Sequence, residues 1–292
     1  MKTLGKNFHW VIAYRKKEDE EFHTVPNPNW GWCADPFLVK YRGEIYLFAE
    51  AFLYKTERKG VLVYCKWNGK CFGDWTVTMD EHWHLSFPNV WTQNDKLYMC
   101  PESYQRGDVA CYRLVDFPNQ WKREKILIDN VKYVDTVFVE RNRKKYLFTF
   151  APAFKDSAGI LKVFESSGGV YREIGNITSD KTLARPGGNF ICGKDTMVRV
   201  GQNSENTYGE GLTFLKVESW FPAYRETEIK KVYARDVPIE SKIKFCGIHT
   251  YNQLEDLEVI DLKYESDFVH EANSQARVRS IFINKYRDNW ED

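Results

Sequence analysis

Two carboxylates bracket an apolar hairpin near the start of the chain. Asp35 precedes Pro36 at the head of one apolar run, Gly43 marks a turn, and the returning run ends in Glu50. The first residue of one hairpin strand faces the last residue of the other, so Asp35 and Glu50 are expected at the same end. Two carboxylates in one place suit acid–base chemistry, although an Asp before Pro also commonly caps a turn.

The same hairpin design recurs along the chain. Pro36, Pro88, Thr136 and Pro186 hold equivalent places in four hairpins and lie 52, 48 and 50 residues apart. A fifth and weaker copy begins at Gly247. A repeat of this length built only from short strands is typical of a β-propeller with one blade per repeat.

The predicted fold is therefore all-β, a five-bladed β-propeller over residues 1–265 with a short C-terminal helix over 266–292. We expect the apolar strand at 9–15 to complete the last blade, because that pairing leaves no open sheet edge. In the C-terminal stretch, apolar residues recur at helical spacing while basic residues occupy other faces. This helix is expected to dock on the propeller, and peripheral contact with a membrane surface or partner is the alternative.

Composition limits the kinds of partner. The chain has 292 residues, 43% of them hydrophobic, which is enough for a large core in a single domain. Lys and Arg number 42 against 41 Asp and Glu, giving a formal net charge of +1. A net charge this small creates no long-range electric field that would attract nucleic acid, so no nucleic-acid partner is predicted.

The N-terminus and the cysteines favour a cytoplasmic location. Residues 1–7 lack the apolar core of a secretory signal, and no apolar run reaches the length of a membrane span. The seven cysteines are scattered through strand-like segments without metal-ligand spacing. We expect buried free thiols in a reducing compartment and no zinc site.

Polar residues cluster at the start of the innermost strands, which meet around the axis of a propeller. The residues expected there are Asp35, His84, Ser86, Asn89, Asp135, Arg185 and His249. Buried Asp–Arg or Asp–His pairs could simply hold the axis together. The alternative is a functional site, because packing alone does not require polar residues at the same place in every repeat.

Eight short motifs occur in order over roughly residues 30 to 265. They read Trp-x-Ala-Asp-Pro-Phe-Leu, Leu-Phe-x-Glu, His-Leu-Ser-Phe-Pro, Pro-Glu-Ser, Phe-Pro-x-x-Trp, Val-Asp-Thr, Arg-Pro-Gly-Gly and Gln-x-x-x-x-x-Tyr-Gly. This set resembles the propeller domain at the N-terminal side of plant glucosamine inositolphosphorylceramide transferases. Similar domains occur in bacterial polysaccharide-biosynthesis proteins, and the five-bladed arabinanases, β-xylosidases and invertases are more distantly similar.

The resemblance to those glycosidases is partial. It implies that Asp35 acts as base or nucleophile, by its Asp-Pro context in the first blade. It also implies a second-blade Asp that tunes pKa, but this chain has Ser86-Phe87-Pro88 there. A later Glu is the general acid of the glycosidases, and Glu102 ends a strand of blade two. The glycosidase triad is therefore incomplete.

Sugar chemistry fits the candidate residues. An oxocarbenium-like transition state needs one carboxylate beneath the anomeric carbon and an acid at the leaving oxygen. Asp35 can supply the carboxylate, and Glu102 or Asp135 the acid if its pKa is raised. The residues expected to contact substrate are Glu50, His84, Ser86, Asn89, Arg185, Gln202, Tyr208, His249 and Trp32.

The function predicted from these observations is a glycosyltransferase of cell-surface polysaccharide or glycolipid biosynthesis. Arg185, Arg199 and the two histidines would serve a sugar donor with a phosphate or nucleotide leaving group, and a glycan or glycolipid would accept the sugar. A glycosidase is the first alternative. A non-catalytic glycan-binding propeller is the second, with Trp30, Trp32, Trp83 and Trp91 as stacking platforms. No dinucleotide fingerprint, P-loop or Asp-x-Asp motif is present, so no cofactor or metal is predicted.

Overall fold

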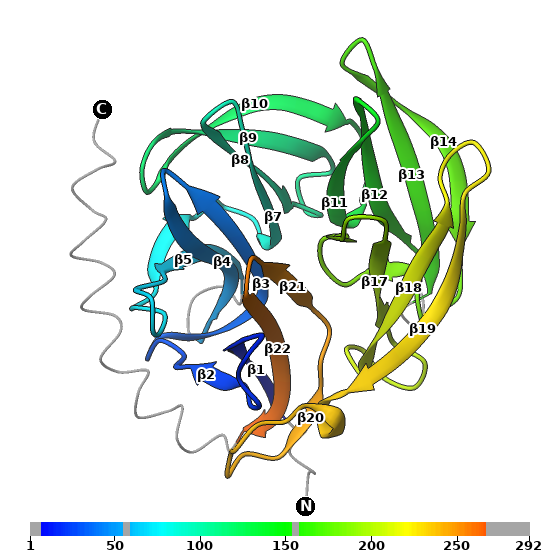
Figure 1. Cartoon of the computed structure of the whole chain (residues 1–292). Coiled ribbons are helices and arrows are strands. Elements are labelled where there is room, and N and C mark those ends of the chain that lie inside the picture. Colours follow the sequence, from blue (N-terminus) through cyan, green and yellow to red (C-terminus); the bar gives the residue numbers. More distant parts are fainter. Residues whose placement is uncertain (1–6, 55–58, 154–157, 267–292) are drawn as a thin grey trace, which may run out of the picture.

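Five antiparallel sheets surround a central axis in the computed structural model, which describes residues 7–54, 59–153 and 158–266. Figure 1 shows the sheets arranged as the blades of a propeller. The prediction of an all-β, five-bladed propeller is confirmed. The only helix of the described chain is the short 3-10 helix η1 (Ala234–Asp236).

Blades one to three each contain four strands in chain order. Blade one contains β3 (Gly31–Tyr41), β4 (Glu44–Leu53), β5 (Gly60–Lys66) and β6 (Thr76–Met79). Blade two contains β7 (Ser86–Gln93), β8 (Lys96–Glu102), β9 (Val109–Asp116) and β10 (Gln120–Ile128). Blade three contains β11 (Val134–Arg141), β12 (Lys144–Pro152), β13 (Gly159–Ser167) and β14 (Val170–Thr178).

Blades four and five have divided strands. Blade four contains β15 (Arg185–Pro186), β16 (Ile191–Cys192), β17 (Met197–Asn203), β18 (Gly211–Ser219) and β19 (Arg225–Tyr233). Blade five contains β1 (Asn7–Lys16), β2 (His23–Val25), β20 (Phe245–Gly247), β21 (Tyr251–Leu254) and β22 (Leu257–Ser266).

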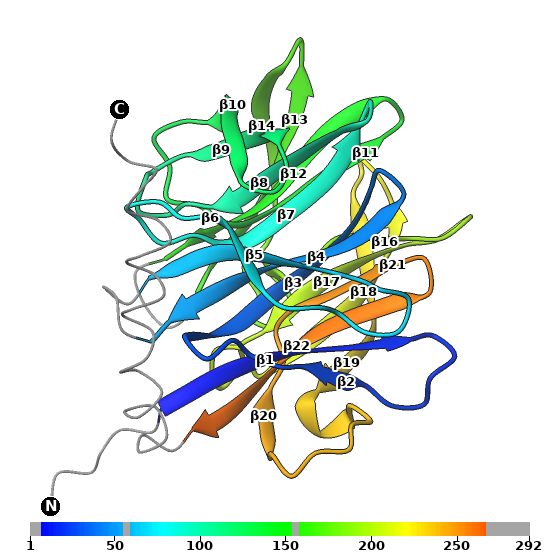
Figure 2. The ribbon, with the colours of Figure 1, turned by 90° about the vertical axis from the view of Figure 1, so that its left-hand side faces the viewer.

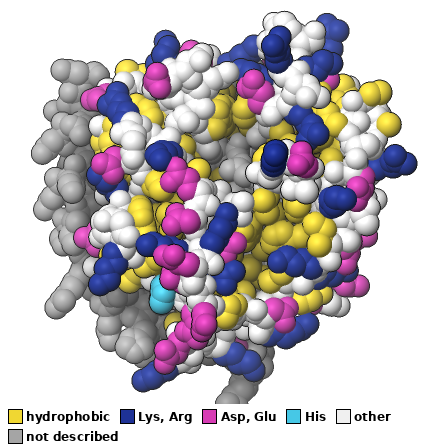
Figure 3. Space-filling model, viewed as in Figure 1, with side chains coloured by type: hydrophobic (Ala, Val, Ile, Leu, Met, Phe, Trp, Pro, Cys, Tyr) yellow, Lys and Arg dark blue, Asp and Glu magenta, His cyan; other side chains and the backbone are white. Residues whose placement is uncertain are grey.

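Figure 3 shows acidic and basic side chains interspersed over one face, as the balanced composition leads one to expect.

The N-terminal strand closes the ring, as predicted. Strand β1 pairs with β22 from Asn7 opposite Ser266 to Lys16 opposite Leu257, and Figure 2 shows the two strands side by side. The C-terminal helix predicted over 266–292 lies outside the described residues except for Ser266, which ends β22. The described chain therefore gives this helix no support. None of the described helices is both long and apolar enough to cross a membrane.

One backbone irregularity repeats in the inner strands of blades one to three. Asp35, Phe87 and Asp135 have positive φ angles of 53°, 43° and 49°. At each position the pairing register between the two inner strands shifts, which marks a β-bulge. Bulges re-aim side chains, and non-glycine residues rarely adopt positive φ. The bulge thus occupies the same position in blades one to three. The residue at this position is Asp in blades one and three and Phe87 in blade two.

The core and the cysteines follow the sequence pattern in part. Phe37, Phe48, Phe87 and Phe148 are fully buried in the largest hydrophobic cluster.

All seven cysteines are free thiols. Cys33, Cys65, Cys100 and Cys111 are buried, whereas Cys71, Cys192 and Cys246 are exposed. The prediction of burial is therefore wrong for three thiols, which lie in turns and at short edge strands.

Candidate active site

A cavity of about 200 Å³ lies at the propeller axis where four blades meet. Its lining residues are Trp10, Trp32, Ala34, Asp35, Glu50, Phe52, His84, Ser86, Glu102, Arg185, Tyr208 and His249. Nine of the twelve predicted site residues are among them. The hairpin argument also holds, because Ala34 pairs with Glu50 across β3 and β4.

Asp35 is fixed by hydrogen bonds to both of its carboxylate oxygens. Oδ1 accepts a bond of 2.9 Å from the Thr250 hydroxyl, and Oδ2 accepts a bond of 3.1 Å from the Phe87 backbone N–H. The residue is only 5% exposed. Burial raises the pKa of Asp35 to about 6, although the nearby charge of His249 opposes this rise. Asp35 is therefore a pre-oriented carboxylate that is largely ionised at neutral pH.

Asp261 supports this arrangement from outside the cavity. Its Oδ2 accepts a hydrogen bond of 3.0 Å from the Asp35 backbone N–H and lies 2.6 Å from Nδ1 of His249. Its Oδ1 accepts bonds from the backbone N–H groups of His249 and Thr250. Burial lowers the pKa of His249, but the charge and hydrogen bond of Asp261 outweigh this and raise it above 6.5. Nε2 of His249 lies 3.7 Å from Oδ1 of Asp35, so a carboxylate adjoins each ring nitrogen and favours the protonated ring.

Glu50 and His84 form a second pair on the opposite wall. The Gly60 N–H donates to Nδ1 of His84 at 2.8 Å, so a neutral His84 carries its proton on Nε2. Nε2 lies 3.5 Å from Oε1 of Glu50, and burial lowers the pKa of His84. Burial and then the charges of Asp35 and Glu102 raise the pKa of Glu50 well above its usual value. A side chain at Gly60 would collide with both Glu50 and His84, so glycine is required there.

Glu102 lies beside an Asp–Arg pair. Burial and the neighbouring Asp135 raise the pKa of Glu102 well above its usual value, and the charge of Arg185 compensates only partly. Nε of Arg185 donates to Oδ2 of Asp135, which also accepts a bond of 2.8 Å from Gln202. Burial thus favours the protonated form of Glu102, next to the Asp135–Arg185 pair.

Three predicted site residues lie behind the lining instead of in it. Asp135 is 2% exposed and is covered by Arg185, while Gln202 is 1% exposed and holds Asp135. Asn89 is also buried, and it joins blades by donating to Asn189 and accepting from the Phe138 N–H. Their positions are those of supporting residues, because a substrate in the cavity reaches the lining first.

Arg199 does not contribute to the cavity, which corrects the expectation of a strongly cationic centre. Its guanidinium makes two bonds to Glu226, of 2.8 and 2.6 Å, and a third to the Leu183 carbonyl. The side chain is 1% exposed. Of the four expected cations, Arg199 lies elsewhere, His84 is neutral, and His249 and Arg185 each face a carboxylate.

Aromatic rings form the remaining walls. The Trp10 ring stacks on His249 with centroids 3.9 Å apart, and the Trp32 ring stacks on Phe52 at 5.0 Å. Tyr208 is 39% exposed and lies edge-on to His249 at 5.4 Å. Aromatic faces with carboxylates between them suit a sugar, which has both apolar C–H faces and hydroxyl groups.

The sequence reasoning missed Asp261, Thr250 and Trp10. Asp261 lies between Ile260 and Leu262 in strand β22, and an acid flanked by apolar residues was the available signal. One ligand atom each from Asp35, His249 and Asp261 lies within 4.8 Å of the others, a grouping that could hold a cation. His249 already lies between the two carboxylates, with Nδ1 2.6 Å from Oδ2 of Asp261 and Nε2 3.7 Å from Oδ1 of Asp35, so the group acts here as an ion-pair network.

The fold and this acidic axial cavity define the class of protein. Three solved structures share the fold at low sequence identity. An α-L-arabinofuranosidase of family GH62 from Coprinopsis cinerea matches with a TM-score of 0.60 and 13% identity over 86% of this chain and 97% of its own. The GH32 β-fructofuranosidase of Bombyx mori matches with a TM-score of 0.60 and 11% identity, over 92% of this chain and 60% of its own. A GH43 enzyme of Xanthomonas citri matches with a TM-score of 0.56 and 10% identity, over 82% of this chain and 89% of its own. The protein is a five-bladed propeller with the fold of these carbohydrate-active enzymes.

The sequence comparisons identify the family more closely. The chain belongs to the family described as "Glucosamine inositolphosphorylceramide transferase 1, N-terminal", which matches residues 23–261. The protein of that name from Arabidopsis thaliana is 31% identical over 211 residues, covering 68% of this chain. Its counterpart from Oryza sativa subsp. japonica is 29% identical over 196 residues, covering 64%. This chain spans only 27% and 26% of the length of these two relatives.

Proposed function

We propose that the axial cavity makes or breaks a glycosidic bond, with Asp35 as the ionised carboxylate and Glu102 as the acid. One observation carries the proposal: a single cavity is lined by two carboxyl groups, Asp35 and Glu102, whose surroundings raise their pKa values to different extents. The pKa of Asp35 is about 6, while that of Glu102 lies well above its usual value. Separated pKa values are how one site supplies both an acid and a base at neutral pH.

The two carboxyl groups have distinct tasks. The positive charge that develops at the anomeric carbon is stabilised by the Asp35 carboxylate, which Phe87 and Thr250 hold in one orientation. Glu102 donates its proton to the leaving oxygen, and the resulting carboxylate is stabilised by the adjacent Arg185. Glu50 is the second acid of the cavity and would contact sugar hydroxyls beside His84.

We further propose that the reaction is sugar transfer from a phosphate-activated donor to a glycan or glycolipid. The names of the curated relatives support transfer. The resemblance to the glycosidases implies an Asp in blade two as a third carboxylate. Phe87 occupies the bulge of blade two in this chain, which disfavours a hydrolase site of that kind. Within the lining, Arg185 is the cation nearest to the acid, and its side chain is 23% exposed. It would face the leaving phosphate.

Hydrolysis is the second candidate, because the structural neighbours are named as glycoside hydrolases. Product analysis separates the candidates. The purified chain is incubated with sugar phosphates and nucleotide sugars, with and without glycan acceptors, and with aryl glycosides. Acceptor-dependent products support transfer, cleavage of aryl glycosides in water supports hydrolysis, and glycan binding without any product overturns the catalytic proposal.

A further inference from the structure

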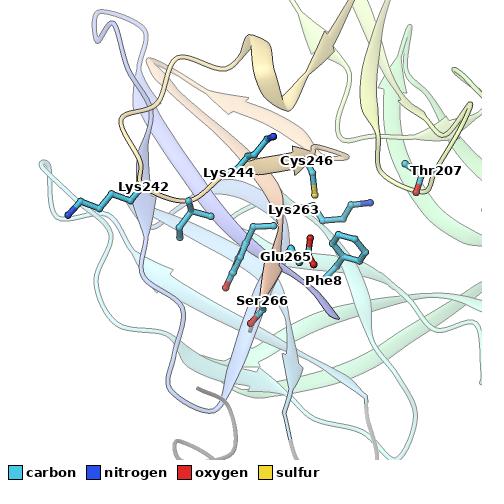
Figure 4. Close-up of a pocket in the computed structure, with 10 residues that line it drawn as sticks. Phe8, Thr207, Lys242, Lys244, Cys246, Lys263, Glu265 and Ser266 are labelled. Carbon is cyan, nitrogen blue, oxygen red and sulfur yellow. The ribbon is translucent and has the colours of Figure 1, made fainter. Parts of the chain in front are cut away.

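A second hollow lies next to the axial cavity. It has a volume of about 720 Å³ and lies between β1, β20, β22 and the turn that contains Thr207. Phe8, Cys246, Lys244, Lys263 and Glu265 contribute to its walls, as Figure 4 shows. Its volume is in the range of ligand-binding pockets, about 300–1,000 Å³, whereas the axial cavity is large enough only for a small group.

The two hollows share a wall. Nζ of Lys263 donates a hydrogen bond of 2.5 Å to the carbonyl oxygen of Tyr208, and it lies 5.6 Å from the ring centre of Trp10. Tyr208 and Trp10 line the axial cavity, whereas Lys263 and Thr207 line the second hollow. A ligand that extends past Tyr208 from one hollow would therefore reach the other.

The second hollow carries the opposite charge. Its lining contains three lysines, Lys242, Lys244 and Lys263, against one carboxylate, Glu265. Figure 4 shows Lys242 and Lys244 pointing away from the side chains of Lys263, Phe8 and Glu265, so Lys263 is the cation that faces the hollow. Lys263 is only 8% exposed and keeps its ammonium group over the Phe8 ring at 5.4 Å. A nearly buried cation in a pocket favours an anionic ligand.

We propose that this hollow binds a phosphate group through Lys263, with Lys244 in the same wall as a second positive charge. The axial cavity would then hold the sugar and the leaving phosphate, and the adjoining hollow a further phosphate group of the donor or acceptor. This inference rests on the proposed function for the identity of the ligand, but phosphate binding itself is measured without turnover. The ligand chemistry is a phosphate ester, supplied either by a soluble sugar phosphate or by a lipid headgroup.

Cys246 provides the readout, because it is an exposed thiol in the wall of the hollow. Its rate of alkylation by iodoacetamide is followed by peptide mass spectrometry. Cys71 and Cys192 are also exposed thiols and lie outside the lining, so they serve as controls within the same molecule. We expect glucose 1-phosphate or inorganic pyrophosphate to slow the alkylation of Cys246 severalfold without affecting the two control thiols, and glucose to have no effect.

Variants test the assignment of the lysines. Lys263→Gln should raise the concentration needed for half-protection by about tenfold or more, since hydrogen bonds to charged groups contribute about 1.5–3 kcal/mol. Lys244→Ala should raise it by less, because this side chain adds charge without facing the hollow. Lys96→Ala, at the exposed start of β8 in blade two, should leave it unchanged. Asp35→Asn should also leave it unchanged, which separates phosphate binding from the proposed reaction.

Phosphatidylcholine vesicles with and without phosphatidylinositol distinguish the source of the phosphate. Protection by soluble esters identifies a soluble ligand, and protection only by the phosphatidylinositol vesicles identifies a lipid headgroup. Either result supports the inference. Absence of protection by every phosphate probe, or equal protection in both lysine variants and wild type, overturns it.

Discussion

Nδ1 of His249 lies 2.6 Å from Oδ2 of Asp261, so an imidazole of the cavity is paired with a carboxylate from the interior of strand β22. The same Asp261 oxygen accepts the backbone N–H of Asp35. One buried residue of the last blade thus sets both the charge of His249 and the position of Asp35. The chain positions its proposed reactive carboxylate through contacts between its first and last blades.

This pairing makes the charge of His249 depend on Asp261. In Asp261→Asn, the largest influence that opposes burial is lost, so the pKa of His249 should fall from its wild-type value. The measurement is an NMR titration of the His249 ring. Asp256→Asn, at the exposed turn before β22, is the control and should leave the titration unchanged. An unaltered His249 pKa in Asp261→Asn would show that the pair does not control its charge.

Asp35 should reduce stability as it ionises. Its folded pKa of about 6 lies above its ordinary value of 3.8, so the folded state binds the proton more tightly. The free energy of unfolding should therefore decrease as the pH rises from 3.8 to about 6. Asp35→Asn removes this contribution, and the difference between variant and wild type should grow over the same interval. Urea unfolding at a series of pH values measures it, and parallel curves would contradict it.

Activity should follow the opposite course with pH. Turnover needs Asp35 ionised, so kcat/KM should rise through about pH 6. It should fall again at higher pH when Glu102, whose pKa is raised, loses its proton. A pH–rate profile of wild type and Glu102→Gln checks both limbs, and loss of the alkaline limb is expected in the variant. An alkaline limb that persists in Glu102→Gln would belong to another group.

Arg199 should be important for stability alone. Replacing it with Lys breaks a two-bond contact with Glu226 in a nearly buried site, and disrupting buried pairs costs about 3–5 kcal/mol. Thermal unfolding should show the loss, while phosphate binding and the KM of the folded variant remain those of wild type. Arg185→Lys should instead weaken binding of a sugar phosphate. A KM effect of the Arg199 variant equal to that of Arg185→Lys would contradict this division.

The blade count was predictable from the sequence because the inner hairpins repeat an apolar pattern near every fiftieth residue, with a proline at the equivalent place in three of them. The outer strands are less apparent. Strand β19, for example, is mostly charged and exposed, since it covers the edge of a blade and packs little apolar surface.

The site was predictable where a residue belonged to the repeat. Glu102 and Arg185 lie at strand ends and Asp35 at the bulge of β3, and all three converge on the axis because of the fold. Asp261 and Trp10 contribute from the middle of two apolar strands, where only the long-range pairing of β1 with β22 brings them to the cavity. Arg199 was misplaced because side chains alternate across a strand, and a one-residue difference in position directs the side chain to the opposite face.

The most direct test of the central claim compares two variants on substrates with good and poor leaving groups. If Glu102 is the acid, Glu102→Gln should retain turnover of a dinitrophenyl glycoside, whose leaving group needs no proton, and lose turnover of a phenyl glycoside by at least about 10²-fold. Asp35→Asn should lose turnover of both, because its charge stabilises the anomeric carbon irrespective of the leaving group. Equal effects of Glu102→Gln on both substrates, or an Asp35→Asn variant as active as wild type, would contradict the assignment of these two residues.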